Sequence, residues 1–214
     1  MSALYYTLIT DGRSDAILIP ILNWLLEENG VNVAIEPQLA DLASLPKPPK
    51  TLAARIGCAI EMYPCDLLFV HRDAEREPRD VREDEIRSAY LKSNSSDNSL
   101  PCICVIPVRM SEAWLLFDEN ALRHAVGNRS KKIPLELPSM HKLESLPDPK
   151  QTLHELLLKA SGAKGRERKR FNANRSVHRI GDIIDDFSPL RSLSAFSHLE
   201  NDIKQFIHQY QHNQ

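Results

Sequence analysis

The order of apolar and polar segments predicts an α/β fold: a mainly parallel four-stranded sheet flanked by helices, with a helical C-terminal extension. Short apolar runs rich in β-branched and aromatic residues alternate with helical patterns over roughly the first 125 of the 214 residues. Such alternation is typical of parallel strands joined by right-handed helical crossovers. The second half lacks strand patterns, so we expect an α/β domain at residues 1–125, and an irregular linker with a helical extension packed on it at 126–214.

Residues 4–26 predict a strand, a tight turn and a helix. The apolar run 4–10 is the strand, and Asp11-Gly12-Arg13-Ser14-Asp15 breaks it. Gly12 can take a positive φ that other residues avoid, and Ser14 or Asp15 can cap the helix that follows. In an open parallel sheet, the carboxyl ends of strands are where sites are built, and Asp11 stands at such an end.

The elements that follow can be predicted from periodicity and from turn residues. The expected strands are 31–35, 65–70 and 101–108, with a proline-rich loop at 37–50. Expected helices are 52–62 behind Thr51, a charged helix at 80–92 with a Glu83–Arg87 pair, and a helix capped by Ser111. Later helices are expected at 149–161, started by Asp148-Pro149 and ended by Gly162, and at 177–184 and 193–210.

Composition limits the class of protein. The formal net charge is −2, so affinity for a polyanion must come from a local patch. We find no secretory signal and no apolar run of about 18 residues, and the four cysteines fit neither a zinc site nor a redox pair. We therefore expect a cytoplasmic protein with reduced core cysteines and no membrane segment. The P-loop, the GxSxG elbow, HExxH and the dinucleotide GxGxxG motif are not found.

Three predicted strands end in polar side chains: Asp11 and Asp15 follow the first, Asp73 and Glu75 the third, and Arg109 and Glu112 the fourth. Because parallel strand ends share one edge of a sheet, these groups should converge. Carboxylates without thiolates are the ligands of Mg²⁺ or Mn²⁺, which activate water and stabilise charge on phosphoryl oxygens. An arginine such as Arg109 would bind the phosphate.

Each of these residues also has a plain structural reading. Asp11 can simply start a turn, and Asp15 can be only a helix cap. Asp73 and Glu75 can belong to a solvated, salt-bridged surface, and Glu112 can be only a partner of Arg109. His71 is expected to be a hydrogen-bonded histidine at a strand end, and Trp114 a core residue.

One segment concentrates positive charge, with Lys164, Arg166, Arg168, Lys169 and Arg170 followed by Arg175 and Arg179. A solvated loop is the default interpretation. The functional alternatives are contact with a phosphate backbone, with Phe171 stacking on a base, or docking on an acidic protein.

The first 125 residues resemble the TOPRIM domain of topoisomerases, primases and overcoming-lysogenization-defect nucleases. The matching residues are Asp11-Gly12-Arg13-Ser14-Asp15 and Asp73-Ala74-Glu75. The family usually has glutamate at the first acid and aspartate at both acids of the pair, where this chain has Asp11 and Glu75. Residues 105–116 are also similar to small bacterial TOPRIM-like proteins associated with partner ATPases in anti-phage defence.

This resemblance implies a division of roles. Asp11 and Asp73 would share one Mg²⁺ or Mn²⁺ ion, with Asp15, Glu75 or Glu112 on a second. Asp11 would be the general base, and Arg109 would complete the catalytic set. The implied protein is a metal-dependent nuclease subunit acting on DNA in preference to RNA. Its partners would be an ABC- or AAA-type ATPase and a second copy of the chain.

Two other functions stay open. An assembly or regulatory module that docks on an ATPase is favoured by Asp11 in place of glutamate. Phosphoryl transfer on a small nucleotide would use a similar sheet edge.

Overall fold

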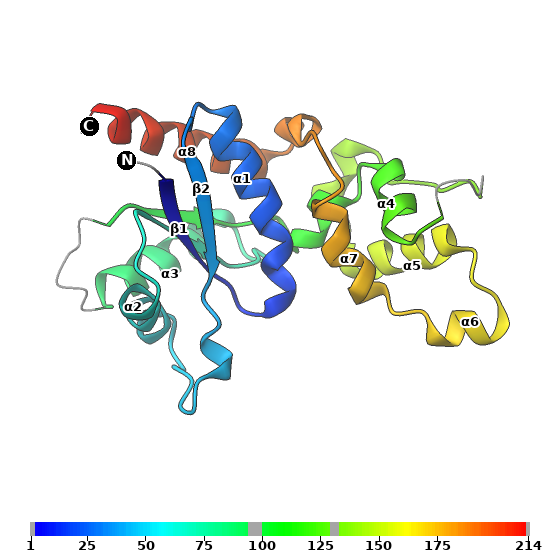
Figure 1. Ribbon diagram of the computed structural model, residues 1–214, viewed down its shortest axis with the longest axis horizontal. Coiled ribbons are helices and arrows are strands. Elements are labelled where there is room, and N and C mark those ends of the chain that lie inside the picture. Colours follow the sequence, from blue (N-terminus) through cyan, green and yellow to red (C-terminus); the bar gives the residue numbers. More distant parts are fainter. Residues whose placement is uncertain (1–2, 94–99, 129–132, 213–214) are drawn as a thin grey trace.

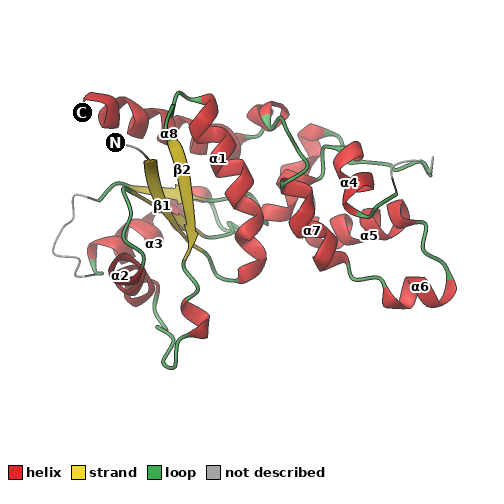
Figure 2. Ribbon diagram, viewed as in Figure 1, coloured by secondary structure: helices red, strands yellow, loops and turns green. Residues whose placement is uncertain are grey.

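The computed structural model describes residues 3–93, 100–128 and 133–212. It shows an α/β body with a four-stranded, all-parallel sheet, and a helical lobe beside it (Figures 1 and 2). The strands are β1 (Ala3–Ile9), β2 (Ala34–Leu39), β3 (Leu67–His71) and β4 (Cys102–Val105), in the order β2-β1-β3-β4. The predicted fold class is confirmed at this level.

Two pairs of helices cover the sheet. One face packs against α1 (Leu18–Glu28) and α8 (Ser194–His212), and the other against α2 (Leu52–Met62) and α3 (Arg79–Leu91). Alternation along β1 explains the division, because Leu4, Tyr6 and Leu8 face α1 and α8 while Ile9 faces α2.

The helical lobe contains α4 (Glu119–Ala125), α5 (Pro149–Ser161), α6 (Gly165–Arg170) and α7 (Ala173–Gly181). Its core is continuous with that of the α1–α8 face of the sheet. α7 packs against the 3₁₀ helix η1 (Arg13–Ile17), and α5 packs against the 3₁₀ helix η3 (Ser111–Leu115). The remaining 3₁₀ helices are η2 (Leu42–Ser44), η4 (Met140–Ser145) and η5 (Ser188–Ser192).

The sheet has a topological switch point at its centre. From β1 the chain crosses to β2 on one side and then returns to β3 on the other. The C-terminal ends of β1 and β3 therefore lead into different connections, and such a switch point is where ligands bind in open α/β sheets. β1 leads to Asp11 and Asp15, and β3 leads to Asp73.

Several local predictions are confirmed. Thr51 caps α2 through its side chain, which accepts a hydrogen bond from the N–H of Ala54. Asp148 caps α5, and Gly162 ends it with φ 65°. Arg87 pairs with Glu83 at 2.5 Å, and Trp114 is buried. All four cysteines are free, and burial raises the pKa of Cys102 to about 12 and of Cys104 to about 11.

Other local predictions are wrong. The second strand is 34–39 rather than 31–35, and it includes Pro37, which an edge strand tolerates because one side of its backbone lacks a neighbour. Gly12 is extended, with φ −149°, and it is the N-cap of the 3₁₀ helix η1 that precedes α1. Asp15 accepts the Gly12 N–H in the capping box of η1, so neither Ser14 nor Asp15 is itself the N-cap. Ser111 caps nothing with its side chain. α7 begins at Ala173 rather than at residue 177, because Asn172 caps it.

Within the described part of the chain, none of the helices combines the length and apolar character needed to cross a bilayer.

Candidate functional site

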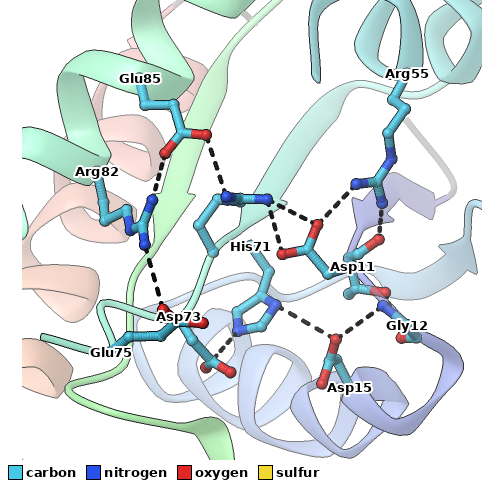
Figure 3. A network of polar contacts seen from close by, with 11 residues as sticks. Asp11, Gly12, Asp15, Arg55, His71, Asp73, Glu75, Arg82 and Glu85 are labelled. Carbon is cyan, nitrogen blue, oxygen red and sulfur yellow. Dashed lines mark hydrogen bonds and ion pairs between the residues drawn. The ribbon is translucent and has the colours of Figure 1, made fainter. Parts of the chain in front are cut away.

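The centre of the site is His71, the last residue of β3, which is 2% exposed. Its Nε2 lies 3.1 Å from Asp73 Oδ1, and its Nδ1 lies 3.6 Å from Asp15 Oδ2 (Figure 3). Nδ1 is buried without a hydrogen-bond partner. The expected strand-end histidine is therefore present, and it stands between two of the predicted site carboxylates.

Asp73 is held in place through one oxygen. Its Oδ1 receives the N–H of Ser111 at 3.0 Å in addition to the contact with His71. Its side chain is 28% exposed, so the carboxylate can be reached from solvent. The first residue of η3 thus orients the acid that follows β3.

Asp15 lies in η1 and is largely buried. One of its oxygens accepts the N–H of Gly12 at 3.2 Å. Burial raises the pKa of Asp15; the charge of His71 and the bond from Gly12 act the other way, but the nearby carboxylates Asp73 and Glu112 add to the rise. Asp15, Asp73 and Glu112 therefore make a concentration of negative charge with His71 inside it.

Glu112 is buried in η3 and meets a cation from the helical lobe. Lys150, in the first turn of α5, places its Nζ 3.3 Å from Glu112 Oε1. The expected pair with Arg109 is wrong, since the described contacts give Arg109 no carboxylate partner. Because α5 packs on η3, the helical lobe contributes a charge to this edge of the sheet.

Asp11 is engaged elsewhere. Its Oδ1 accepts from Arg55 Nη1 at 2.7 Å, and its Oδ2 accepts from Arg72 Nη1 at 2.9 Å. Burial opposes its ionisation, but the hydrogen bonds and charges of the two arginines prevail and lower its pKa. The structure thus places Asp11 in ion pairs with Arg55 and Arg72 and brings Asp15, rather than Asp11, against His71.

Asp11 begins a chain of alternating charges over the α2 and α3 side of the sheet edge (Figure 3). Arg72 also meets Glu85 at 3.2 Å, Glu85 meets Arg82 at 2.9 Å, and Arg82 meets Glu75 at 3.7 Å. The Glu75 side chain is 68% exposed, so it lies at the outer end of this chain.

Two non-glycine residues at the site have a left-handed backbone. Glu75 has φ 54° and Arg109 has φ 67°, and the N–H of Glu75 donates to the carbonyl of Arg109 at 3.3 Å. Such conformations cost of order 1–3 kcal/mol and are concentrated at functional sites. Both residues lie beyond the C-terminal ends of the strands, on the same side of the sheet as the carboxylates.

The fit of a divalent cation can be judged from the donor set. Among the residues that the structure describes, no group of three or more His, Cys, Asp or Glu side chains is arranged to hold a metal ion. Mg²⁺, however, is commonly bound by one or two carboxylates, several waters and substrate phosphates. Asp15 and Asp73 fit that mode, because both are close to other negative charge and Asp73 is accessible; Asp11 does not, because two arginines occupy its oxygens.

Sequence reasoning did not identify Arg55, Arg72 and Lys150 as parts of this edge. Arg55 and Arg72 lie 44 and 61 residues from Asp11, and no local pattern connects them. The five predicted nucleic-acid contacts, 164–170, lie on or next to α6 and away from the sheet (Figure 1).

Comparison of the chain with protein-family models, with curated proteins and with solved structures gave no match.

Proposed function

We propose that this chain is a phosphodiesterase dependent on Mg²⁺ or Mn²⁺, a nuclease subunit of the TOPRIM-like kind. The observation that carries the proposal is the pair Asp15 and Asp73, which come from adjacent strands at the switch point and flank the buried His71. A cation bound by one of these carboxylates, with waters and substrate phosphates as its other ligands, would activate water and stabilise the charge that develops on a phosphoryl oxygen.

The protein groups have separate tasks in this proposal. His71 and the Ser111 N–H fix Asp73 through Oδ1, so that Oδ2 is left for the ligand. Arg109, between β4 and η3, and Lys150 of α5, which also pairs with Glu112, would donate to phosphate oxygens. The resemblance adds DNA as the preferred substrate and an ABC- or AAA-type ATPase as the partner.

The first test is cleavage of supercoiled plasmid by the purified chain with Mg²⁺ or Mn²⁺. Asp73→Asn should lose more activity than the ~10–100-fold typical of removing an outer-shell group from a metal site. Asp66→Asn is the matched control, because Asp66 precedes the opposite end of β3 and accepts the N–H of Tyr5 at 3.0 Å. We expect this control to cleave like the wild type. Full activity in Asp73→Asn would contradict the proposed site.

A second candidate function is favoured by the ion pairs of Asp11. With both oxygens of the first acid held by Arg55 and Arg72, the domain would be a docking or regulatory module for an ATPase, without hydrolysis. Cleavage by the wild type that is lost in Asp73→Asn would exclude this module; no cleavage with either ion would favour it.

A further inference from the structure

The helical lobe carries a group of cations that face solvent. We call Lys164, Arg166, Arg168, Lys169, Arg170 and Arg175 the basic segment. All six are exposed, and α6 buries no residue. Within the described contacts none of the six forms an ion pair. In residues 3–93 and 100–117, by contrast, six of the eight arginines meet a carboxylate, at positions 13, 55, 72, 79, 82 and 87.

These cations do not help the fold. A helix of six residues with no apolar face is marginal by itself, and like charges four positions apart, such as Arg166 and Arg170, destabilise it further. Anchoring comes from outside the charged residues: Gly162 and Gly165 turn the chain with positive φ, and Phe171 packs against the core rather than standing free. The positive charges of the basic segment are therefore not used by the fold and are available to a ligand outside the chain.

The chemistry of the basic segment favours phosphate over an acidic protein. Protein–protein interfaces have an apolar centre with few charges, and the basic segment offers no exposed apolar side chain. Interfaces with nucleic acid are polar and strongly positive. Four of the six cations are arginines, whose planar fork matches a phosphate group.

α7 lies between the sheet and α6, and its length separates the two places that the ligand would contact. Its last residue, Gly181, lies against η1 and the start of α1: a Cβ there would stand 3.0 Å from Pro20 Cγ and 3.5 Å from the carbonyl oxygen of Ile17. Its nine residues extend roughly 13 Å away from that contact, towards α6. A ligand that contacts both the Asp15 end of α7 and α6 has to extend along this helix, which favours a strand of several nucleotides over a single nucleotide.

We infer that the basic segment is a docking surface for the phosphate backbone of a polynucleotide whose scissile bond lies at the sheet edge. Only the position of the scissile bond rests on the proposed function, because docking of the phosphate backbone can be measured without cleavage. It names the substrate class as a strand of several nucleotides rather than a free nucleotide.

The experiment is fluorescence anisotropy of a labelled 20-nucleotide single strand in EDTA, over a range of salt concentrations. Lys169→Gln/Arg170→Gln should weaken binding and reduce the slope of log K against log salt by about 1.4, which is about 0.7 for each phosphate that the protein no longer neutralises. Lys47→Gln/Lys92→Gln is the control, since it removes two exposed lysines of the α/β body. Urea unfolding should show no loss of stability in the test variant.

Each result has a defined meaning. An unchanged affinity and slope in Lys169→Gln/Arg170→Gln would overturn the docking surface, and so would equal competition by polyglutamate or by a mononucleotide at the same concentration. Binding that follows the expectation in a chain that never cleaves plasmid would leave the docking surface standing and remove the nuclease. Plasmid cleavage with an unchanged KM in the variant would support the nuclease and overturn the docking surface.

Discussion

At the scale of single residues, the two acids of the first turn show how position decides chemistry. Asp11 and Asp15 are four residues apart, yet the pKa of Asp11 is lowered by two arginines and the pKa of Asp15 is raised by burial and by neighbouring carboxylates. Asp11 is thus an ionised partner in a network, whereas the ionised form of Asp15 is disfavoured by burial and by the carboxylates near it. A group of the second kind is suited to binding a cation.

Asp11→Asn should destabilise the protein at pH 7 by less than about 1 kcal/mol, since the pairs with Arg55 and Arg72 are partly exposed. A carboxyl whose pKa is lowered on folding stabilises the native state above its unfolded pKa of about 3.9, and this contribution is lost as the pH falls through the native value. Urea unfolding should therefore show a smaller difference between variant and wild type at pH 4 than at pH 7. An equal difference at both values would contradict these ion pairs.

At the scale of elements, side-chain caps fix where several helices begin. Thr51, Asp118, Asp148 and Asn172 each accept a backbone N–H in the first turn of α2, α4, α5 and α7. These starts place Lys150 beside Glu112 and place α2 so that Arg55 reaches Asp11. Close packing between neighbouring segments also fixes where helices lie. The clearest case is Gly57 in the middle of α2, which packs against the backbone that follows α3.

Gly57→Ala should destabilise the protein, by about 1–3 kcal/mol before the gain in helix propensity is counted. A Cβ at this position would lie 2.9 Å from the backbone carbonyl oxygen of Ser93, just after α3, so the two segments must separate. Helix propensity alone would favour alanine by about 1 kcal/mol. The comparison is Ala54→Gly on the exposed side of α2, which reports propensity without contact. A more stable Gly57→Ala protein in urea unfolding would contradict this packing.

At the scale of the whole molecule, one apolar core joins the sheet to the helical lobe. It runs from β1 and α1 through η3 to α5 and α7, and α8 returns to the sheet to complete it. Trp24 of α1 and Trp114 of η3 both contact Phe196 of α8, so the aromatic groups of three distant segments meet there. We expect the lobe and the α/β body to unfold together.

Leu157→Ala tests this coupling. Leu157 in α5 is fully buried, and its truncation should cost about 2–5 kcal/mol. Because the core is continuous, tryptophan fluorescence and far-ultraviolet circular dichroism should shift to the same lower urea midpoint. A fluorescence transition that stays at the wild-type midpoint would show instead that the helical lobe unfolds independently.

The sequence by itself determined the α/β class, the parallel order of elements, most helix starts and the presence of acids after β1 and β3. These features depend on local periodicity, caps and turn residues, which neighbouring residues in the chain specify. Only the tertiary structure decided that Arg55 and Arg72 hold Asp11, that His71 separates Asp15 from Asp73, that Lys150 meets Glu112, and that Pro37 lies within an edge strand. The physical reason is that each of these depends on which segments pack side by side, and a pattern within one segment carries no record of its distant neighbour.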